Sequence, residues 1–342
     1  MFNIKIEKDK AQEMIAKLKE EKNLDNRYKI KRIDRFVIIP VLKITDKLSA
    51  FRADEKLEEQ KPSRKGFKEI LLENNTIPKE IATKLNSAYD VVGDIVIIRI
   101  DESYKRYYKE IGKALLLLHP NCKTVLNKLG EHKGIYRTQD MELVYGVDKR
   151  ETIVKENGCM IKIDVEKVFC STRLSEERKR IANLVNPDET IGIFFAGAGP
   201  FALAIAKNKK VKQIIAIELN EIATSYLKEN IKLNRLEGII IPVLGDVKEE
   251  ARKYPNYFDR VVMPLPMSSE LFLDSAIFST KDKGFIHIYK FVDKNDPYTE
   301  TEKEILKIAE ENNARIEVIG KRVIRSYSPA IVQIVLDLKL HK

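Results

Sequence analysis

The sequence is poor in the residues that build disulfide frameworks and metal centres. It has three cysteines, Cys122, Cys159 and Cys170, with no CxxC pair, and it has four histidines. These counts argue against a disulfide-stapled fold and against a structural zinc site, because such a site needs clustered ligands. We expect no metal, and a reducing cytoplasm is the simplest location for the chain.

Long apolar runs are also missing. No apolar segment reaches the ~18–20 residues that a membrane-spanning helix needs. The first fourteen residues, MFNIKIEKDKAQEM, lack the apolar segment of a signal peptide. We therefore expect no membrane contact, and we expect a monomer.

The composition nevertheless supports a folded protein with a charged partner. Apolar residues make up 44% of the 342 residues and are spread along the chain, which argues against disorder. At ~100–200 residues per domain, this length predicts two or three domains. Lys+Arg exceed Asp+Glu by 62 − 52 = 10, which favours a polyanionic partner. That signal is weak alone, since many basic proteins bind no nucleic acid.

Three units follow from the pattern of apolar residues: 1–60, 61–166 and 167–342. The first contains an amphipathic helix at 10–20, with Met14, Ile15 and Leu18 at helical spacing, and a strand at 36–42. Residues 54–65 are mostly charged and contain Pro62, so they read as a linker. A solvated helix leading into a loop explains them equally well.

The second unit is predicted to be a small domain that contains both strands and helices. Its clearest element is a predicted strand at 91–100, and a helix is predicted at 104–118. Further strands are predicted at 124–129, 141–145 and 160–165, where polar and apolar residues alternate.

The third unit alternates predicted strands with predicted helices. Alternation of this kind indicates βαβ units and a mostly parallel sheet of the Rossmann-like type. The last two strands are joined by a short loop, so we expect one antiparallel strand at the edge of the sheet. The strands are predicted at 191–195, 213–219, 239–244, 260–263, 285–291, 315–323 and 331–338, and the helices at 200–207, 221–233, 268–278 and 300–313.

Ligand-binding signals follow the strands of this third unit in order. Gly197 and Gly199 lie in a turn that opens a helix, where a backbone approaches a ligand closely; an ordinary tight turn is the alternative. Glu218 ends the next strand, about 20 residues on, where a carboxylate accepts from ribose hydroxyls. Asp246 follows the third strand and could lie beside an adenine edge, although Asn220 and Asp246 also suit helix N-caps.

The fourth strand ends in a loop with two prolines, Pro264 and Pro266. Such a loop is rigid and poor in hydrogen-bond donors. Many methyltransferases have a proline-containing loop here facing the methyl donor, and a simple strand break is the alternative.

Taken together, these signals resemble a class I methyltransferase that uses S-adenosylmethionine. Over nearly its whole length the chain resembles the archaeal tRNA (guanine-37) methyltransferase and wyosine-pathway family. The resemblance implies a class I domain preceded by two small RNA-binding domains, with tRNA as partner. The motifs that carry it are Tyr89–Asp94, Gly134–Arg137, Lys155–Gly158, Val168–Arg178, Phe195–Phe201 and Ser326–Pro329.

The resemblance also implies roles for single residues. Arg137 is placed on the O6 of the target guanine, and Glu177 is the proposed general base. Guanine N1 carries a proton, so a carboxylate must remove it while a cation holds the charge that develops on O6. Tyr136 and Phe169 are candidate partners for a base turned out of its stack. The implied donor contacts are Phe169, Arg178, Phe195, Gly197, Gly199, Glu218, Leu219, Asp246, Val247 and Pro264.

Two residues depart from the pattern of most family members. Pro264 stands where most have asparagine, and Ile193 stands where most have aspartate. Both resemble the subgroup that also methylates carbon 7 of the tricyclic wyosine precursor 4-demethylwyosine. The expected function is therefore methylation of guanosine 37 at N1 and of the precursor at C7. An aminocarboxypropyl transferase and a noncatalytic RNA-binding protein are the alternatives.

Overall fold

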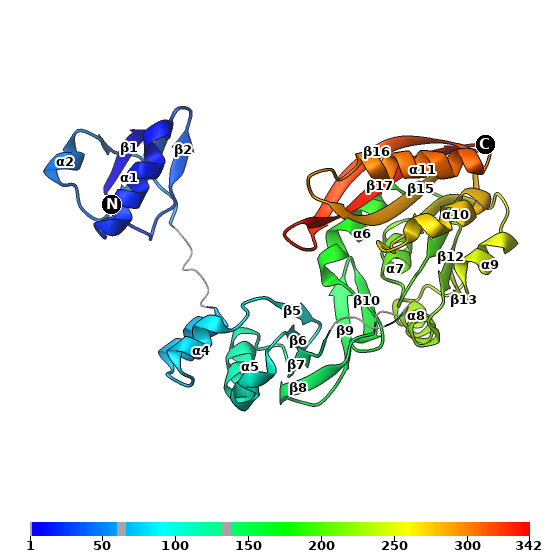
Figure 1. Ribbon diagram of the computed structural model, residues 1–342, viewed down its shortest axis with the longest axis horizontal. Helices are drawn as coiled ribbons and strands as arrows, with labels where there is room; N and C mark the ends of the chain where they lie inside the picture. The colour runs from blue at the N-terminus through cyan, green and yellow to red at the C-terminus, as the bar shows by residue number, and fades with distance from the viewer. Residues whose placement is uncertain (1, 60–65, 131–133, 135–137) are drawn as a thin grey trace. The chain divides into compact units, whose positions relative to one another are not determined.

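The computed structural model describes residues 2–59, 66–130, 134 and 138–342. The chain divides into two compact units, Met1–Gly66 and Phe67–Lys342 (Figure 1). Within the described residues, no helix combines the length and the apolar character needed to cross a lipid bilayer.

The first unit is a small antiparallel sheet with one long helix. Strand order is β2-β3-β1-β4, and β3 (Phe36–Val41) pairs with both β1 (Phe2–Glu7) and β2 (Lys31–Ile33). Helix α1 (Lys8–Glu20) follows β1 directly and buries Leu18 against the sheet core. The remaining elements are α2 (Asp46–Ser49) and β4 (Arg52–Ala53).

The second unit begins with a four-stranded sheet in the order β5-β6-β7-β8. The predicted single strand at 91–100 was wrong. It is a hairpin of β5 (Tyr89–Val92) and β6 (Ile95–Ile98), because Gly93 adopts a positive φ of 57° and turns the chain. The other elements are α3 (Phe67–Glu73), α4 (Lys79–Lys84), the 3₁₀ turn η1 (Glu102–Tyr107), α5 (Tyr108–Leu118), β7 (Thr124–Lys128) and β8 (Met141–Gly146).

A separate hairpin of β9 (Glu151–Glu156) and β10 (Cys159–Asp164) joins this sheet to the larger one. Helix α8 (Glu221–Asn234) lies along the outer edge of β10. Asn234 and Asn230 of that helix accept from the backbone N–H groups of Met160 and Lys162 at 2.9 and 2.7 Å. Two side chains spaced i,i+4 on the helix thus satisfy an edge that would otherwise stay unpaired.

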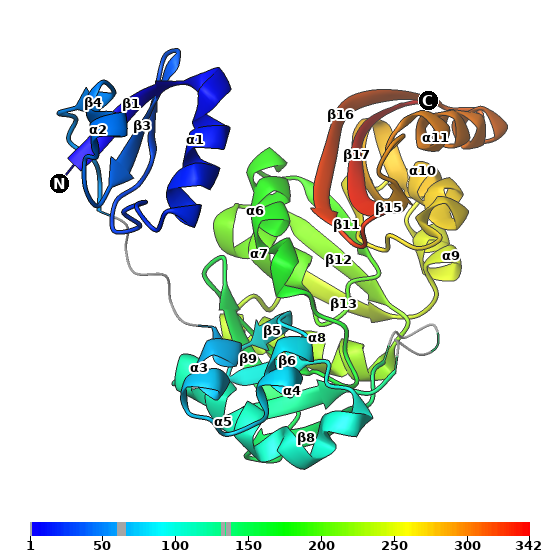
Figure 2. The ribbon, with the colours of Figure 1, turned by 60° about the vertical axis from the view of Figure 1, so that its left-hand side comes forward.

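A seven-stranded sheet in the order β13-β12-β11-β14-β15-β17-β16 forms the largest layer. The strands are β11 (Thr190–Phe194), β12 (Gln213–Glu218), β13 (Ile240–Leu244), β14 (Phe258–Met263), β15 (Thr280–Asp293), β16 (Arg315–Ser326) and β17 (Ile331–His341). Helices cover both of its faces (Figure 2). On one face lie α6 (Ser175–Leu184), α7 (Pro200–Asn208) and α8, and on the other lie α9 (Val247–Glu250), α10 (Leu273–Ser279) and α11 (Thr299–Glu311).

The apolar runs of the strands explain why both faces are covered. Alternate residues of β12 enter opposite cores: Ile214 and Ala216 pack on one side, Ile215 and Ile217 on the other. The mostly parallel sheet was predicted, but the position of its antiparallel strand was wrong. β17 lies between β15 and β16 and is antiparallel to both, because the connection through α11 leaves a gap that β17 fills.

Candidate active site

A cavity of about 600 Å³ opens at the carboxyl ends of the parallel strands, and we call it the donor cavity. Ligands of open α/β sheets bind at this edge. The structure brings together most of the residues predicted from the sequence. Its lining includes Phe169, Phe195, Gly197, Glu218, Leu219, Asp246, Val247 and Pro264.

The turn after β11 has the conformation that the glycines predicted. Phe195, Gly197 and Gly199 all have positive φ values, of 61°, 57° and 91°. Gly197 lines the donor cavity, so the backbone itself can approach a ligand there. Gly199 is not among the lining residues and has another role. A Cβ on Gly199 would lie 2.4 Å from Cδ1 of Leu227, so this glycine lets α7 pack closely on α8.

Glu218 ends β12 with both carboxylate oxygens anchored. One oxygen accepts from the backbone N–H of Gly197 at 2.7 Å, and the other from that of Asn220 at 2.8 Å. Burial raises the pKa of Glu218, and these backbone hydrogen bonds oppose the rise. Each carboxylate oxygen has about two acceptor sites. Glu218 therefore keeps capacity to accept from two neighbouring hydroxyl groups, as in a ribose.

Asn220 and Asp246 both cap helices and both line the donor cavity. The Asn220 amide oxygen accepts from the N–H groups of Ile222 and Ala223 at 2.9 and 3.2 Å. Asp246 accepts from the N–H of Lys248 at 2.7 Å. The capping roles that competed with ligand binding in the sequence are thus confirmed, and they also hold these side chains at the cavity.

The loop at residues 264–266 presents acceptors but no backbone donor. Prolines 264 and 266 lack an N–H group, and the N–H of Leu265 is used by the carbonyl of Met263 at 2.8 Å. The Pro266 carbonyl accepts from the N–H of Phe291 at 3.0 Å. Among the described residues, no hydrogen bond is made to the carbonyls of Pro264 and Leu265, which can therefore accept from a ligand. Pro264 and Leu265 line the donor cavity, so the loop suits a ligand edge that donates hydrogen bonds.

Sequence reasoning missed the apolar wall beside this loop. Met267, Leu271 and Phe272 line the donor cavity, and Leu271 remains 59% exposed. The predicted helix at 268–278 is shorter, because a 3₁₀ turn, η4 (Ser269–Phe272), precedes α10. Exposed apolar residues directly after two prolines were the signal that could have indicated a ligand wall.

Glu177 and Arg178 lie on α6 and are not among the described residues that line the donor cavity. Arg178 is 1% exposed; its guanidinium binds Glu156 of β9 and donates to the carbonyl of Ser171 at 2.9 Å. Arg178 therefore fixes the segment that carries Phe169, and it does not reach the cavity itself.

Glu177 is 4% exposed and its carboxylate is held by two partners. Arg180 donates to both oxygens at 2.8 and 2.9 Å, and the Tyr289 hydroxyl donates at 2.7 Å. Burial and the neighbouring carboxylate raise the pKa of Tyr289, so its hydroxyl stays protonated and donates. These bonds use three of about four acceptor sites of a carboxylate, leaving one lone pair on Oε2.

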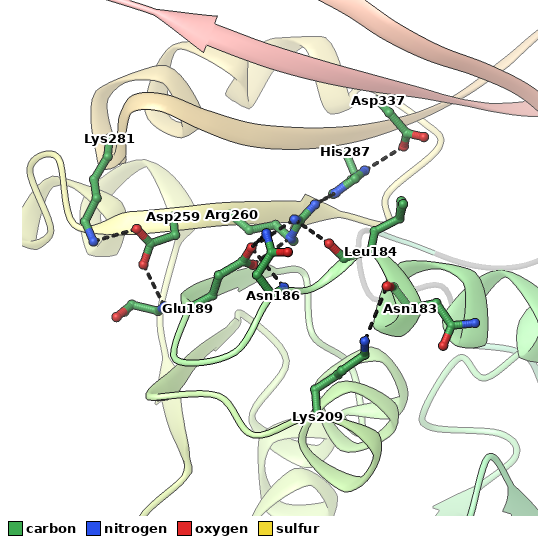
Figure 3. A network of polar contacts seen from close by, with 11 residues as sticks. Asn183, Leu184, Asn186, Glu189, Lys209, Asp259, Arg260, Lys281, His287 and Asp337 are labelled. Atoms are coloured by element: carbon green, nitrogen blue, oxygen red, sulfur yellow. Dashed lines mark hydrogen bonds and ion pairs between the residues drawn. The ribbon is translucent and has the colours of Figure 1, made fainter.

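A buried network extends behind Glu177 through the sheet. Arg180 also donates to Asp337 of β17 at 2.6 and 3.0 Å, and Asp337 contacts Nδ1 of His287 at 2.6 Å. Figure 3 shows how His287 in turn meets Arg260, which is paired with Glu189. Burial would raise the pKa of Asp337, but hydrogen bonds from His287 and Arg180 hold it well below its usual value.

The tautomer of His287 follows from its neighbours. A guanidinium can only donate, so Nε2 of His287 must accept from Arg260 at 2.7 Å and Nδ1 must carry the proton. Burial, helped by Arg260, lowers the pKa of His287 although Asp337 opposes the shift. A neutral imidazole therefore links the two ion pairs, and the network holds Arg180 in one position.

Arg137 and Tyr136 lie outside the described residues. Gly134, in the same motif, lines the donor cavity. The role of Arg137 on the target base therefore stays a prediction.

Three family models match the chain. They are the TRM5/TYW2 methyltransferase domain at residues 152–319, the TYW2 N-terminal domain at 67–149 and the tRNA methyltransferase 5 N-terminal domain at 4–49. Together they cover both compact units.

Individual proteins give the same result. The tRNA (guanine(37)-N(1))-methyltransferase Trm5b of Pyrococcus abyssi is 38% identical over 93% of this chain and 92% of its own. The tRNA(Phe) (4-demethylwyosine(37)-C(7)) aminocarboxypropyltransferase of Methanocaldococcus jannaschii is 35% identical over 74% of this chain and 98% of its own. A solved complex of aTrm5 with tRNALeu has a TM-score of 0.70 at 34% identity and covers 99% of each chain.

Proposed function

This chain belongs to the TRM5/TYW2 family of tRNA methyltransferases, and on that premise we propose that it transfers the methyl group of S-adenosylmethionine to N1 of guanosine 37 in tRNA. The donor cavity is the observation that supports this most. It lies at the carboxyl edge of a sheet in the order expected of a class I methyltransferase, and Glu218, Asp246 and the Gly197 turn meet there.

In this proposal the donor's adenosine lies between the ends of β12 and β13. Glu218 accepts from the ribose hydroxyls, and Asp246 faces the adenine edge. The walls formed by Phe195, Leu219 and Phe272 are apolar and exclude water from the transferred group. S-Adenosylmethionine supplies an electrophilic methyl group; the protein's contribution is to hold donor and acceptor in line.

The acceptor base is proposed to lie against Phe169 and the 264–266 loop. The exocyclic amino group of guanine offers N2–H donors, which suit the acceptor carbonyls of Pro264 and Leu265 and leave the N1 proton to a separate base. Arg137 is proposed to hold O6, and Glu177 to accept the N1 proton through its remaining lone pair. Both of its other partners, Arg180 and Tyr289, donate to Glu177, so neither of them competes as an acceptor for that proton.

A second activity, methylation of 4-demethylwyosine at C7, is proposed from the two departures at Ile193 and Pro264. Pro264 has no side-chain amide at the position where most of the family has asparagine. Its side chain therefore cannot donate a hydrogen bond to an acceptor atom of the base. An aminocarboxypropyl transfer is less favoured, because residues 4–49 match the tRNA methyltransferase 5 N-terminal domain. We also propose that the chain acts as a monomer, which sedimentation at assay concentration checks.

The test is a transfer assay with a labelled methyl donor. One tRNA transcript carries guanosine 37, a matched transcript carries adenosine 37, and a third tRNA carries the tricyclic base. We expect N1-methylguanosine from the first, identified by nucleoside mass and retention, and none from the second. A parallel reaction uses donor labelled in its aminocarboxypropyl chain. Transfer of that label to the tRNA, with no transfer of the methyl label, would overturn the proposal.

A further inference from the structure

A second cavity, of about 280 Å³, adjoins the donor cavity, and Val168 and Phe169 line both. Its walls come from three parts of the chain: the sheet of β5 to β8, β10 with the segment that follows it, and the end of β16 with the turn before β17. Three motifs that carried the family resemblance meet here, and the proposed methyl transfer leaves two of them, Tyr89–Asp94 and Ser326–Pro329, without a role.

The second cavity is strongly cationic. Arg99, Lys128, Arg173 and Arg325 line it, against one carboxylate, Asp90, among the described lining residues. Asp90 is shared: Lys128 donates to it at 3.0 Å and Arg173 at 2.6 Å. Arg325 is also held in place, because it donates to Gln333 at 2.8 Å. Four cationic side chains against one carboxylate among the described lining residues favour an anionic ligand.

An aromatic ring stands at the rim of the second cavity. Tyr327 lines it and remains 56% exposed, which is unusual for so large an apolar ring. The ring is not loose, because it packs on Phe291 with ring centroids 4.4 Å apart. The N–H of Tyr327 also donates to the carbonyl of Ile331 at 2.8 Å, which closes the turn. A fixed and accessible ring beside cations is the arrangement that binds an unstacked base and its phosphate.

We propose that the second cavity binds the nucleotide covalently next to the target, with its phosphate among Arg173 and Arg325 and its base on Tyr327. The proposal rests on the proposed function, since it needs an RNA base in the donor cavity. A base that leaves its stack deprives its neighbour of a stacking partner. The ring of Tyr327 replaces that partner, and the shared wall of Val168 and Phe169 makes the two cavities direct neighbours, as consecutive nucleotides require.

The size of the second cavity agrees with one nucleotide. At about 280 Å³ it lies just below the usual range of small-ligand sites, so it has room for a single sugar-phosphate or base and not for a folded loop. The chain beyond that nucleotide must therefore leave over the rim, where Tyr327 stands.

The test removes the ring from the full-length protein. We expect Tyr327→Ala to raise KM for tRNA, and its dissociation constant, about 5- to 100-fold, the range for one stacked base. Tyr327→Phe keeps the ring and should retain wild-type values. Affinity for S-adenosylhomocysteine should not change in either variant. Tyr257→Ala removes another partly exposed tyrosine, outside both cavities, and is the matched control.

Modified RNA makes the test specific for a base. Full-length tRNAs are prepared by ligation with an abasic nucleotide at position 36 or at position 38. We expect one of these two abasic tRNAs to bind wild-type protein as weakly as intact tRNA binds Tyr327→Ala. Combining that abasic tRNA with Tyr327→Ala should weaken binding no further. That result also identifies which neighbour occupies the second cavity.

Two outcomes would overturn the inference: unchanged tRNA affinity in Tyr327→Ala, or losses from the protein and RNA changes that simply add. Dissociation constants are measured without methyl transfer, so this test stands apart from the proposed reaction. The wild-type protein could methylate guanosine 37 while Tyr327→Ala binds tRNA normally. That pair of results would leave the proposed function intact and overturn only the proposed role of the second cavity.

Discussion

The two cavities of the second unit share a wall but have opposite electrostatic character. The donor cavity has Glu218 and Asp246 among its described lining residues and neither lysine nor arginine, whereas the second cavity has four cations and one carboxylate. S-Adenosylmethionine carries a sulfonium cation and RNA is a polyanion. Each ligand is therefore attracted to its own side of Phe169 and disfavoured on the other, which gives specificity as well as affinity.

The largest expected effect is on the rate of methyl transfer, and it concerns Glu177, which is among the described lining residues of neither cavity. Glu177→Gln should lower the single-turnover rate on guanosine 37 by roughly 10²–10⁴, the usual range for a lost general base. The loss should be smaller on the tricyclic base, whose carbon nucleophile requires no N1 proton to leave. The rate is measured with donor and enzyme both saturating.

Glu176→Gln is the matched control, because Glu176 is the adjacent carboxylate on α6 and is exposed. Binding of both ligands should stay near wild type in each variant. Small and equal losses on the two substrates would leave Glu177 as a structural partner of Arg180 only.

The second prediction tests whether the cavities really divide the ligands. Glu218→Ala should weaken S-adenosylhomocysteine by about 1–3 kcal/mol, because charged hydrogen bonds to the ribose are lost. Affinity for tRNA should not change. Isothermal titration of each ligand separately gives both values.

Glu221→Ala serves as its control, since Glu221 is an exposed carboxylate three residues further along the chain. If tRNA affinity fell together with donor affinity in Glu218→Ala, the two cavities would not be independent.

The smallest effect concerns pH. Burial raises the pKa of Glu218 above its usual value near 4.5. Donor binding needs the carboxylate form, so affinity is complete above the raised pKa and is lost as pH falls through it. We expect S-adenosylhomocysteine affinity to fall at acidic pH sooner than an ordinary glutamate would cause, and Glu218→Gln to flatten that dependence. A wild-type affinity that is constant down to pH 4.5 would contradict this.

Local patterns predicted the parts of this protein that depend on local chemistry. The glycine turn after β11 and the carboxylates at the ends of β12 and β13 follow from positions next to strands, and all reach the donor cavity. The failures arise where a distant partner decides the outcome. Val91–Ile100 has the composition of one long strand, yet Gly93 turns it, and a Cβ on Gly93 would lie 2.1 Å from Oγ1 of Thr152.

The surroundings of Glu177 were also harder to predict than the residues of the donor cavity, because distant strands determine them. Its helix position and its pairing with Arg180 three residues further on are readable from the sequence. Tyr289 of β15, which donates to Glu177, and Asp337 of β17, which anchors Arg180, lie more than 100 residues away along the chain. No spacing rule predicts such contacts, because they depend on the order of strands in the sheet. The second cavity was missed for this reason too, since its walls come from three stretches that only the folded chain brings together.

The place of β17 between β15 and β16 has a consequence for synthesis. A ribosome delivers β17 after both of its neighbours, so until then β15 has an unpaired edge and β16 has no strand to pair with. Asp337, which holds Arg180 against Glu177, arrives with that strand. A nascent chain lacking β17 would have the donor-binding strands in place while its proposed base was still unanchored, so competence to bind the methyl donor should precede competence to transfer it.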